Sequence, residues 1–296
     1  MKKINIIPSS LTLGNAVCGF AAIVKVGNFA MNPDKPEYLV IAAWLILIAM
    51  LLDSLDGKVA RITKTTSDIG CQLDSLSDAI SFGVAPAFLA TIWNSKFLVQ
   101  PPTETFWANV TWFFCLSYAL AAVLRLARFN VENKHDKEHH QNFVGLPTPG
   151  AAGLVASLVI LHKYLLNLSL NQDIIGAGII GSDTAGWLAK CIPALLPLVM
   201  IILAFLMVSS RIKYVHVLNK LFSGKKTFDY FTYLLFASIL LVLIMEIALV
   251  GAFLVYALSG PVYFFVSYIR AVQRERRSAF SSENNKGVES GKGKTD

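Results

Sequence analysis

Five aspartates lie in one short stretch whose two ends are apolar enough to enter a membrane: Asp53, Asp56, Asp68, Asp74 and Asp78. A carboxylate near a lipid bilayer is unfavourable unless it has a partner or a function. Asp53 and Asp56 are three positions apart, and Asp74 and Asp78 are four apart, so each pair shares one face of a helix. Asp68 is better explained as a helix cap. The other four acids are candidates for a shared site.

Two antiparallel helices joined at this end of the stretch would bring the four carboxylates to the same depth, where they repel one another. The basic residues between the two pairs, Lys58, Arg61 and Lys64, are too few to neutralise them. Hard divalent cations bind oxygen ligands, and Mg²⁺ combines a few carboxylates with substrate phosphates. Two ions sharing such ligands can clamp a diphosphate and stabilise the charge that develops on cleavage. We therefore predict a site for two Mg²⁺ or Mn²⁺ ions.

Small residues accompany these acids. Gly57 follows the second aspartate directly, Ala60 lies about one helical turn further on, and Gly70 precedes the third aspartate by four positions. Together they leave a groove in which a bulky group can approach the backbone. Arg61 can pair with a phosphate or with a carboxylate. The pattern therefore leaves room for a phosphorylated ligand beside the metal site.

The elements that must position these residues are membrane helices. The chain has 296 residues, 55% hydrophobic and 15% charged, with a mean hydropathy of +0.57, whereas a soluble domain has about 25% charged residues. A spanning helix needs about 20 apolar residues. We predict an all-α, polytopic membrane helix bundle with about eight transmembrane helices, near residues 10–27, 37–60, 71–93, 106–127, 148–166, 188–208, 229–246 and 248–269.

Two stretches of this chain allow more than one interpretation. The last two predicted spans are nearly fused, and Glu246 and Gly251 mark the expected reversal between them. Residues 167–187 are semi-apolar and glycine-rich, which fits either a short interfacial helix or part of a span. The sequence assigns no function to Glu246.

The basic residues predict the orientation. With the N-terminus inside, only Lys25, Lys35, Lys96, Lys163 and Lys190 of the 26 lysines and arginines fall on the outer side, which is a positive-inside pattern with both termini inside. The net charge of +7 then reflects anionic lipid of the inner leaflet rather than nucleic acid. We expect a membrane-embedded domain over residues 1–270 and a basic, then disordered, cytoplasmic tail over residues 271–296.

The acidic stretch also carries a family resemblance. It reads D-x-x-D-G-x-x-A-R from Asp53 to Arg61, followed after eight residues by G-x-x-x-D-x-x-x-D from Gly70 to Asp78. Every position resembles the signature of the CDP-alcohol phosphatidyltransferase family. The resemblance implies the helical CDP-alcohol phosphotransferase fold, with an active site at the cytoplasmic face. It also implies the transfer of a phosphatidyl group from a CDP-linked lipid to an alcohol, with release of CMP.

The resemblance further implies a role for each residue of the signature. The implied metal ligands are Asp53, Asp56, Asp74 and Asp78, and Asp78 would also act as the catalytic general base. A carboxylate within about 3 Å suits that task, because the hydroxyl of the acceptor alcohol must lose its proton as it attacks. The implied CDP-binding residues are Gly57, Ala60, Arg61, Gly70 and, near the diphosphate, Thr12.

Three further stretches narrow the resemblance: "IPSSLTLGNAVCGFAAI", "RLARFNVENK" followed by "FVGLPTPGAAG", and "FLMVSSRIKY". They are similar to the phosphatidylserine synthase branch of the family. This similarity implies CDP-diacylglycerol and L-serine as substrates, a homodimer, and the cytoplasmic membrane of a bacterium. Arg125 and Arg128 suit the serine carboxylate and Asn130 suits its ammonium group. Alternatively, the two arginines only anchor their span at the lipid headgroups.

Two other functions fit parts of the pattern. A sibling transferase would use another acceptor, such as glycerol 3-phosphate or inositol phosphate, and would want a further phosphate-binding cluster. A divalent-cation channel or transporter would use the carboxylates as a filter. A filter calls for symmetry-related acids or broken helices at mid-membrane depth, whereas these acids lie at the inner ends of two helices, with glycine and alanine between them. The sequence therefore favours the transferase.

Overall fold

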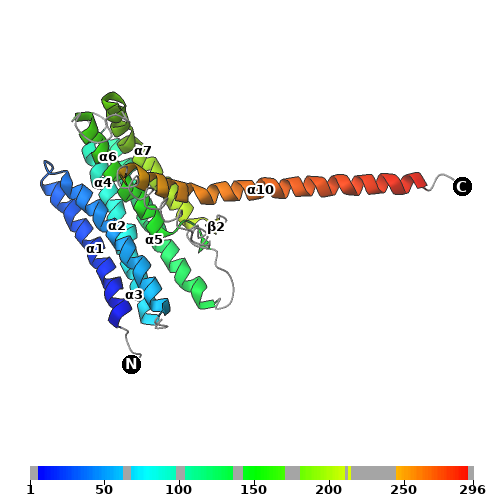
Figure 1. Ribbon diagram of the computed structural model, residues 1–296, viewed down its shortest axis with the longest axis horizontal. Coiled ribbons are helices and arrows are strands. Elements are labelled where there is room, and N and C mark those ends of the chain that lie inside the picture. The colour runs from blue at the N-terminus through cyan, green and yellow to red at the C-terminus, as the bar shows by residue number, and fades with distance from the viewer. Residues whose placement is uncertain are drawn as a thin grey trace, which may run out of the picture.

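A computed structural model describes residues 6–62, 68–97, 104–135, 143–170, 181–210, 213–214 and 245–292. These residues form a bundle of long helices with one short pair of strands (Figure 1). Seven helical stretches within these ranges are long and apolar enough to cross a membrane, which confirms the predicted polytopic helix bundle: Ser9–Met31, Glu37–Val59, Ile69–Phe97, Phe106–Val131, Thr148–Leu170, Ser182–Val208 and Met245–Arg270. Of the predicted span at 229–246, residues 229–244 lie outside the described residues. Met245 and Glu246 begin the last helix, which continues without a break through Gly251, so the reversal expected between Glu246 and Gly251 is wrong.

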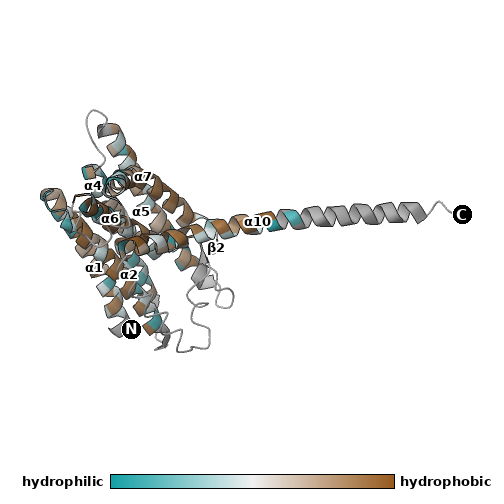
Figure 2. Ribbon diagram, turned by 45° about the horizontal axis from the view of Figure 1, so that its top comes forward, coloured by the Kyte–Doolittle hydropathy of each residue, from teal (hydrophilic) through white to brown (hydrophobic). Residues whose placement is uncertain are grey.

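The outside of the bundle is apolar (Figure 2). Large side chains such as Phe20, Trp112 and Phe205 are more than half exposed on three different helices. Such exposure would be unfavourable in water, but it is the expected state of side chains that face lipid.

The first two helices form an antiparallel hairpin. α1 (Ile6–Met31) ends where the Asn32 N–H donates to the carbonyl of Asn28 at 2.9 Å, and α2 (Glu37–Ile62) begins just after Pro36. A Cβ on Gly14 would lie 3.4 Å from Leu52 Cδ1. The beginning of α1 therefore packs against the end of α2 that carries the first pair of aspartates.

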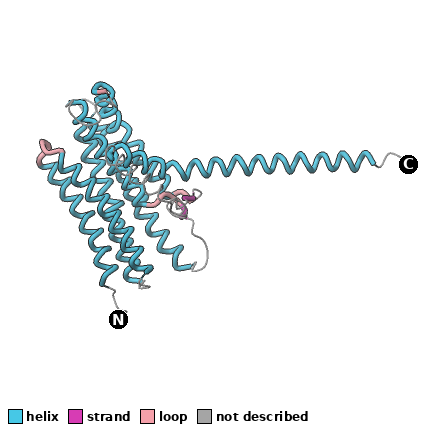
Figure 3. The backbone as a smooth tube through the Cα atoms, in the orientation of Figure 1, coloured by secondary structure: helices cyan, strands magenta, loops and turns pink. Residues whose placement is uncertain are grey.

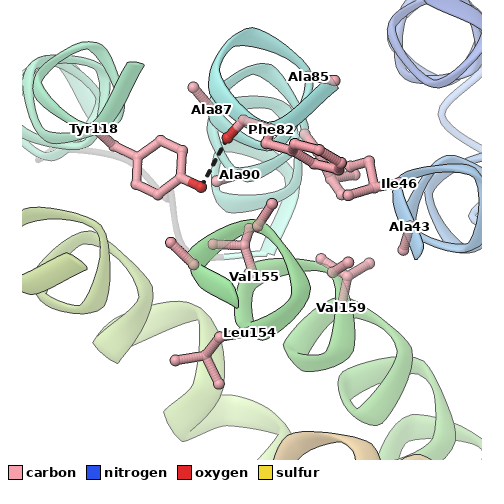
Figure 4. Close-up of a cluster of buried hydrophobic side chains, with 14 of the residues drawn as sticks. Ala43, Ile46, Phe82, Ala85, Ala87, Ala90, Tyr118, Leu154, Val155 and Val159 are labelled. Atoms are coloured by element: carbon pink, nitrogen blue, oxygen red, sulfur yellow. Dashed lines mark hydrogen bonds between the residues drawn. The ribbon is translucent and has the colours of Figure 1, made fainter. Parts of the chain in front are cut away.

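The third span is a broken helix. It consists of α3 (Asp68–Asp78), a π-helical turn, η1 (Ala79–Val84), and α4 (Ala85–Phe97). Pro86 has no N–H, and its ring displaces the carbonyl four residues earlier, that of Phe82. The hydroxyl of Tyr118 donates to this carbonyl at 3.0 Å (Figure 4). A π-turn follows from the proline, and it lies directly after Asp78, where such turns are often found at functional sites.

α5 (Glu104–His135), α6 (Thr148–Leu170) and α7 (Ser182–Val208) lie alongside these helices in the bundle (Figure 3). In α7, the sixth span, a proline again leaves a carbonyl without its helical N–H partner, and a side chain donates to it. Pro197 in α7 cannot donate to the carbonyl of Pro193, and the side-chain amide of Asn94 donates to that carbonyl at 2.7 Å. Thr111 in turn donates to Asn94 Oδ1 at 3.0 Å. Buried polar atoms between α4, α5 and α7 are therefore satisfied by one another.

The core lies where α2, α4, α5 and α6 meet. Figure 4 shows Ile46 of α2 and Phe82 of η1 packing over Val155 and Val159 of α6. Many of the remaining core positions are alanine, which lets helices approach closely in a membrane, where small residues favour association.

A short strand pair joins two loops at one end of the bundle. β1 (Phe143–Val144) pairs antiparallel with β2 (Lys213–Tyr214). The next residue, Gly145, has φ of 81°, and a Cβ there would lie 2.5 Å from the carbonyl oxygen of Met207. Only glycine adopts this conformation and this close approach readily. It sets the position at which α6 begins.

The last helix, α10 (Met245–Lys292), crosses the bundle and projects away from it (Figures 1 and 2). Its first part packs on α6, where Gly150 and Gly153 face the rings of Tyr256 and Phe253. The backbone of α10 is helical to Lys292, and it includes most of residues 271–296, for which a basic and then disordered tail is predicted. Residues 271–280 are rich in Ala, Arg, Gln and Glu, which favour helix. A domain boundary at residue 270 stays a prediction.

The glycine-rich stretch at 167–187 is described only at its ends. Residues 167–170 are the last residues of α6, and residues 182–187 are the first of α7. Residues 171–180 lie outside the described ranges.

Candidate active site

Three of the four predicted metal ligands come together at the junction of α2 and α3. One carboxylate oxygen each from Asp53, Asp56 and Asp74 lies within 4.8 Å of the other two. Asp56 is buried, and the other two are half-buried. The i, i+3 spacing on α2 points both of its acids at α3, as expected from the helical period.

Asp78 lies one turn beyond Asp74, at the last residue of α3. It is buried, and it is close enough to Asp53 and Asp74 for a direct electrostatic interaction. It is not a member of the three-carboxylate cluster. A role for Asp78 in metal binding therefore stays a prediction.

Helix α1 supplies polar partners to the acids. The hydroxyl of Thr12 donates to Asp56 Oδ2 at 2.8 Å, and the amide of Asn15 donates to Asp78 Oδ1 at 3.0 Å. The sequence analysis places Thr12 near a diphosphate and assigns nothing to Asn15. The available signal is the spacing of three between two polar residues in an apolar helix, which puts both on the face that meets the acids.

The approach of α1 to this site depends on a glycine. A Cβ on Gly19 would overlap Ser81 of η1, including its Cα at 2.7 Å. The Ser81 hydroxyl donates to the carbonyl of Asn15 at 2.9 Å. Ser81 lies about one turn after Asp78 in η1, and its hydrogen bond fixes the backbone of Asn15. The side-chain amide of Asn15 is therefore held beside Asp78 by the π-turn that follows this acid.

The acidic cluster fits a divalent cation. Asp53, Asp56 and Asp74 place one oxygen each within 4.8 Å of one another, and Asp74 Oδ1 is buried with no hydrogen-bond partner among the described residues. Carboxylates this close repel one another, and a hard cation with oxygen ligands relieves their repulsion. The donor set is all oxygen, as Mg²⁺ and Mn²⁺ prefer.

A cavity of about 490 Å³ opens beside the cluster. One wall holds Asp53, Asp74 and Asp78, and Arg125 of α5 lies among the other lining residues. The remaining wall is formed by residues 147–150 at the start of α6 and by Ala252, Phe253 and Tyr256 of α10. Small-molecule sites occupy about 300–1,000 Å³, so this cavity is large enough for a ligand.

The other predicted binding residues are placed as follows. Gly57 is exposed, with open space where a Cβ would be, and Gly70 is half-buried in α3. Ala60 and Arg61 belong to the last turn of α2, and their side chains lie outside the described part of the structure. The structure therefore leaves the predicted nucleotide groove only partly described.

The predicted serine-binding residues separate into different positions. Arg125 lines the cavity, whereas Arg128 is exposed and does not. Asn130 accepts a hydrogen bond from the hydroxyl of Ser75 at 3.0 Å, and Ser75 is a lining residue. Asn130 thus contacts the cavity through Ser75.

Comparison with known proteins gives a consistent picture. The sequence model of the CDP-alcohol phosphatidyltransferase family matches residues 5–182. The chain is 36% identical over 168 residues to a protein of Methanocaldococcus jannaschii, covering 56% of this chain and 67% of that one. It is 33% identical over 145 residues to a protein of Helicobacter pylori, covering 49% and 56%.

A third relative, from Saccharomyces cerevisiae, is 36% identical over 180 residues, covering 58% of this chain and 59% of that one. All three relatives are named CDP-diacylglycerol–serine O-phosphatidyltransferase. The chain therefore spans between about half and two thirds of the length of these relatives.

Proposed function

The chain belongs to the CDP-alcohol phosphatidyltransferase family, and on that premise we propose that it transfers the phosphatidyl group of CDP-diacylglycerol to L-serine, giving phosphatidylserine and CMP. The names of the relatives support serine as the acceptor. One observation carries the proposal: three carboxylates have oxygens within 4.8 Å of one another, and two of them, Asp53 and Asp74, line a cavity that is also lined by a fourth acid and an arginine.

In the proposed reaction, the hydroxyl of serine attacks the phosphorus on the lipid side of the diphosphate. Asp78 accepts the hydroxyl proton, the bond from phosphorus to the CMP oxygen breaks, and CMP leaves with the electron pair. Asn15 holds Asp78 Oδ1, so Oδ2 is the oxygen that takes the proton. Positioning and charge neutralisation carry most of the catalysis in such transfers, without a covalent enzyme intermediate.

Asp53, Asp56 and Asp74 would hold Mg²⁺ or Mn²⁺, and we propose two ions with Asp78 as a further ligand. When bound, the cations neutralise the diphosphate and stabilise the charge on the departing CMP. Thr12 keeps Asp56 in place by donating to its Oδ2, which is a role in shaping the cluster rather than in direct contact with the diphosphate.

Gly57, Ala60, Arg61 and Gly70 would bind the CDP group, as the family signature implies. The open space around Gly57 supports this role, because a ligand can lie against its backbone. Arg125 is the best candidate for the serine carboxylate, since it lines the cavity. Asn130 would act through Ser75, and Arg128 is the weaker candidate because it is exposed outside the cavity.

We also propose the cytoplasmic membrane of a bacterium as the location, with the active site and both termini on the cytoplasmic side. The distribution of lysine and arginine supports this orientation, and anionic lipids of the inner leaflet would be its partners. A homodimer is proposed from the family resemblance.

The test is CMP release by the purified full-length chain with CDP-diacylglycerol and Mn²⁺ or Mg²⁺. L-serine, glycerol 3-phosphate and inositol phosphate are compared as acceptors, the lipid product is identified by mass spectrometry, and Asp78→Asn is measured in parallel. We expect release that requires L-serine, yields phosphatidylserine and is lost in the variant.

Release with glycerol 3-phosphate or inositol phosphate instead would keep the site but overturn serine as the acceptor. Full activity in Asp78→Asn would refute the assignment of the base. A folded protein that transports Mn²⁺ into vesicles and releases no CMP with any acceptor would favour the transporter.

A further inference from the structure

The lining of the cavity contains, besides the acids, a polar group that the mechanism does not use. Thr148, the first residue of α6, is 1% exposed and lines the cavity. Its hydroxyl oxygen has no hydrogen-bond partner within the described residues. An unsatisfied buried hydroxyl is unfavourable, and a ligand bound in the cavity would satisfy it.

Thr148 also lies at a helix N-terminus that faces the cavity. The first turn of α6 begins Thr148-Pro149-Gly150, and all three residues line the cavity. Pro149 has no N–H, and the N–H of Ala151 donates to the carbonyl of Pro147 at 3.1 Å. Thr148 and Gly150 therefore carry the N–H groups that this turn can offer, and the helix dipole adds partial positive charge there. An anion is the ligand that such an end attracts.

A formal positive charge completes this part of the lining. Arg125 lines the same cavity, and it interacts electrostatically with Tyr256 of α10. Tyr256 reaches this position because residue 150 is glycine: a Cβ there would lie 2.7 Å from the Tyr256 ring. The lining of one cavity therefore combines a guanidinium, two residues with hydroxyls, Thr148 and Tyr256, and a helix N-terminus with three aspartates.

The acids and the other polar lining residues suit different parts of one small molecule. The acids repel a carboxylate and attract cations, whereas Arg125, Thr148 and the α6 end attract an anion. We propose that Thr148 and the first turn of α6 bind the carboxylate of the amino-acid acceptor, and that Tyr256 positions Arg125 for the same carboxylate. This inference rests on the proposed function and adds the residues that bind the carboxylate of the acceptor. Tyr256 lies beyond residues 5–182, the part that the family model matches.

The experiment measures CMP release by the full-length chain with L-serine and with L-serinamide, which keeps the hydroxyl and the ammonium but lacks the carboxylate. Thr148→Val removes the hydroxyl at constant shape, and Tyr256→Phe does the same in α10. We expect Thr148→Val to raise the KM for L-serine by about tenfold or more, as loss of a hydrogen bond to a charged group does. Tyr256→Phe should raise the same KM because Arg125 loses the hydroxyl that positions it. The KM for CDP-diacylglycerol should change by less than about twofold. The preference for L-serine over L-serinamide should fall by the same factor as the KM rises.

Matched controls separate this role from a structural one. Thr148→Ser keeps the hydroxyl and should restore the wild-type KM for serine. Ser157→Ala removes a buried hydroxyl of α6 that bonds its own helix at the carbonyl of Leu154, and Tyr263→Phe removes an exposed one from α10. Neither control should change the preference between the two acceptors.

The outcomes separate the two proposals. Wild-type protein that makes no phosphatidylserine refutes the proposed function, and with it the carboxylate site. Wild-type protein that makes phosphatidylserine, with Thr148→Val and Tyr256→Phe matching their controls in KM and in acceptor preference, refutes the carboxylate site alone. Equal rises in the KM values of both substrates would also refute it, because they indicate a general distortion of the cavity.

Discussion

Asn15→Leu should abolish much of the activity while leaving the fold intact. The side chain of Asn15 is fully buried, and its amide donates to Asp78 Oδ1 at 3.0 Å. A hydrogen bond to a charged group contributes about 1.5–3 kcal/mol. If the bond holds Asp78 for proton transfer, its loss lowers kcat by about 10- to 100-fold, since about 1.4 kcal/mol corresponds to tenfold.

The stability of the same variant should change little, for a reason that is visible in the structure. Asn15 Oδ1 is itself buried without a hydrogen-bond partner among the described residues. Leucine removes this unsatisfied acceptor, which offsets the unfavourable loss of the donor to Asp78; each effect is about 1–3 kcal/mol. We expect the free energy of unfolding to stay within about 1 kcal/mol of wild type.

Asn94→Leu is the matched control. Asn94 is also fully buried, but both ends of its amide are bonded, to the carbonyl of Pro193 and to the hydroxyl of Thr111. Its replacement leaves both partners unsatisfied, which should destabilise the protein by about 2 kcal/mol or more without a selective loss of kcat.

The assay pairs kcat for CMP release at saturating substrates with thermal unfolding of the purified protein in detergent. The reasoning is wrong if folded Asn15→Leu keeps the wild-type kcat. It is also wrong if the two variants lose activity and stability in the same proportion, because a selective role for Asn15 would then be absent.

Three further predictions follow from single contacts. Gly19→Ala should separate α1 from Ser81, destabilise the protein by about 1–3 kcal/mol and lower kcat. Gly27→Ala is the control, because a Cβ there meets no atom within 4 Å, and it should change neither stability nor kcat. Thermal unfolding curves and kcat values of the two variants test this. Tyr118→Phe removes the donor to a buried carbonyl in the π-turn, so thermal unfolding should show a loss of about 1–3 kcal/mol. EDTA should stop CMP release and Mn²⁺ should restore it, and Asp53→Asn should raise the Mn²⁺ concentration for half-maximal activity about tenfold or more; equal metal titrations for variant and wild type would remove Asp53 from the ligand set.

Local patterns predict much of this molecule. The spacing of Asp53, Asp56 and Asp74 fixes which helix faces they occupy, and the apolar runs fix where the helices lie, so the cluster at the α2–α3 junction could be predicted from the sequence. Both features depend on a helical period that is local to each segment. The break after Asp78 has a local signal too, namely Pro86.

The partners of the acids are harder to predict because they depend on packing between distant segments. Asn15 meets Asp78 only because Gly19 lets α1 approach the π-turn. Thr148 faces the cavity only because α6 begins where Gly145 turns the chain. The contribution of Tyr256 depends on where α10 crosses the bundle, which no periodicity within α10 determines.

Two backbone carbonyls lack a helical N–H partner because a proline lies four residues later, and this affects how the helices assemble in the membrane. Before the helices pack, the carbonyls of Phe82 and Pro193 face lipid with no N–H to bond, which is unfavourable by several kcal/mol for each group. Tyr118 and Asn94 satisfy them only when α5 and α4 lie at one height and one rotation against their neighbours. A helix that slides by a turn would leave a polar atom exposed to hydrocarbon. These two hydrogen bonds therefore favour one alignment of the helices over misaligned bundles. Apolar contacts alone distinguish poorly between alignments, because the surrounding lipid is as apolar as the side chains.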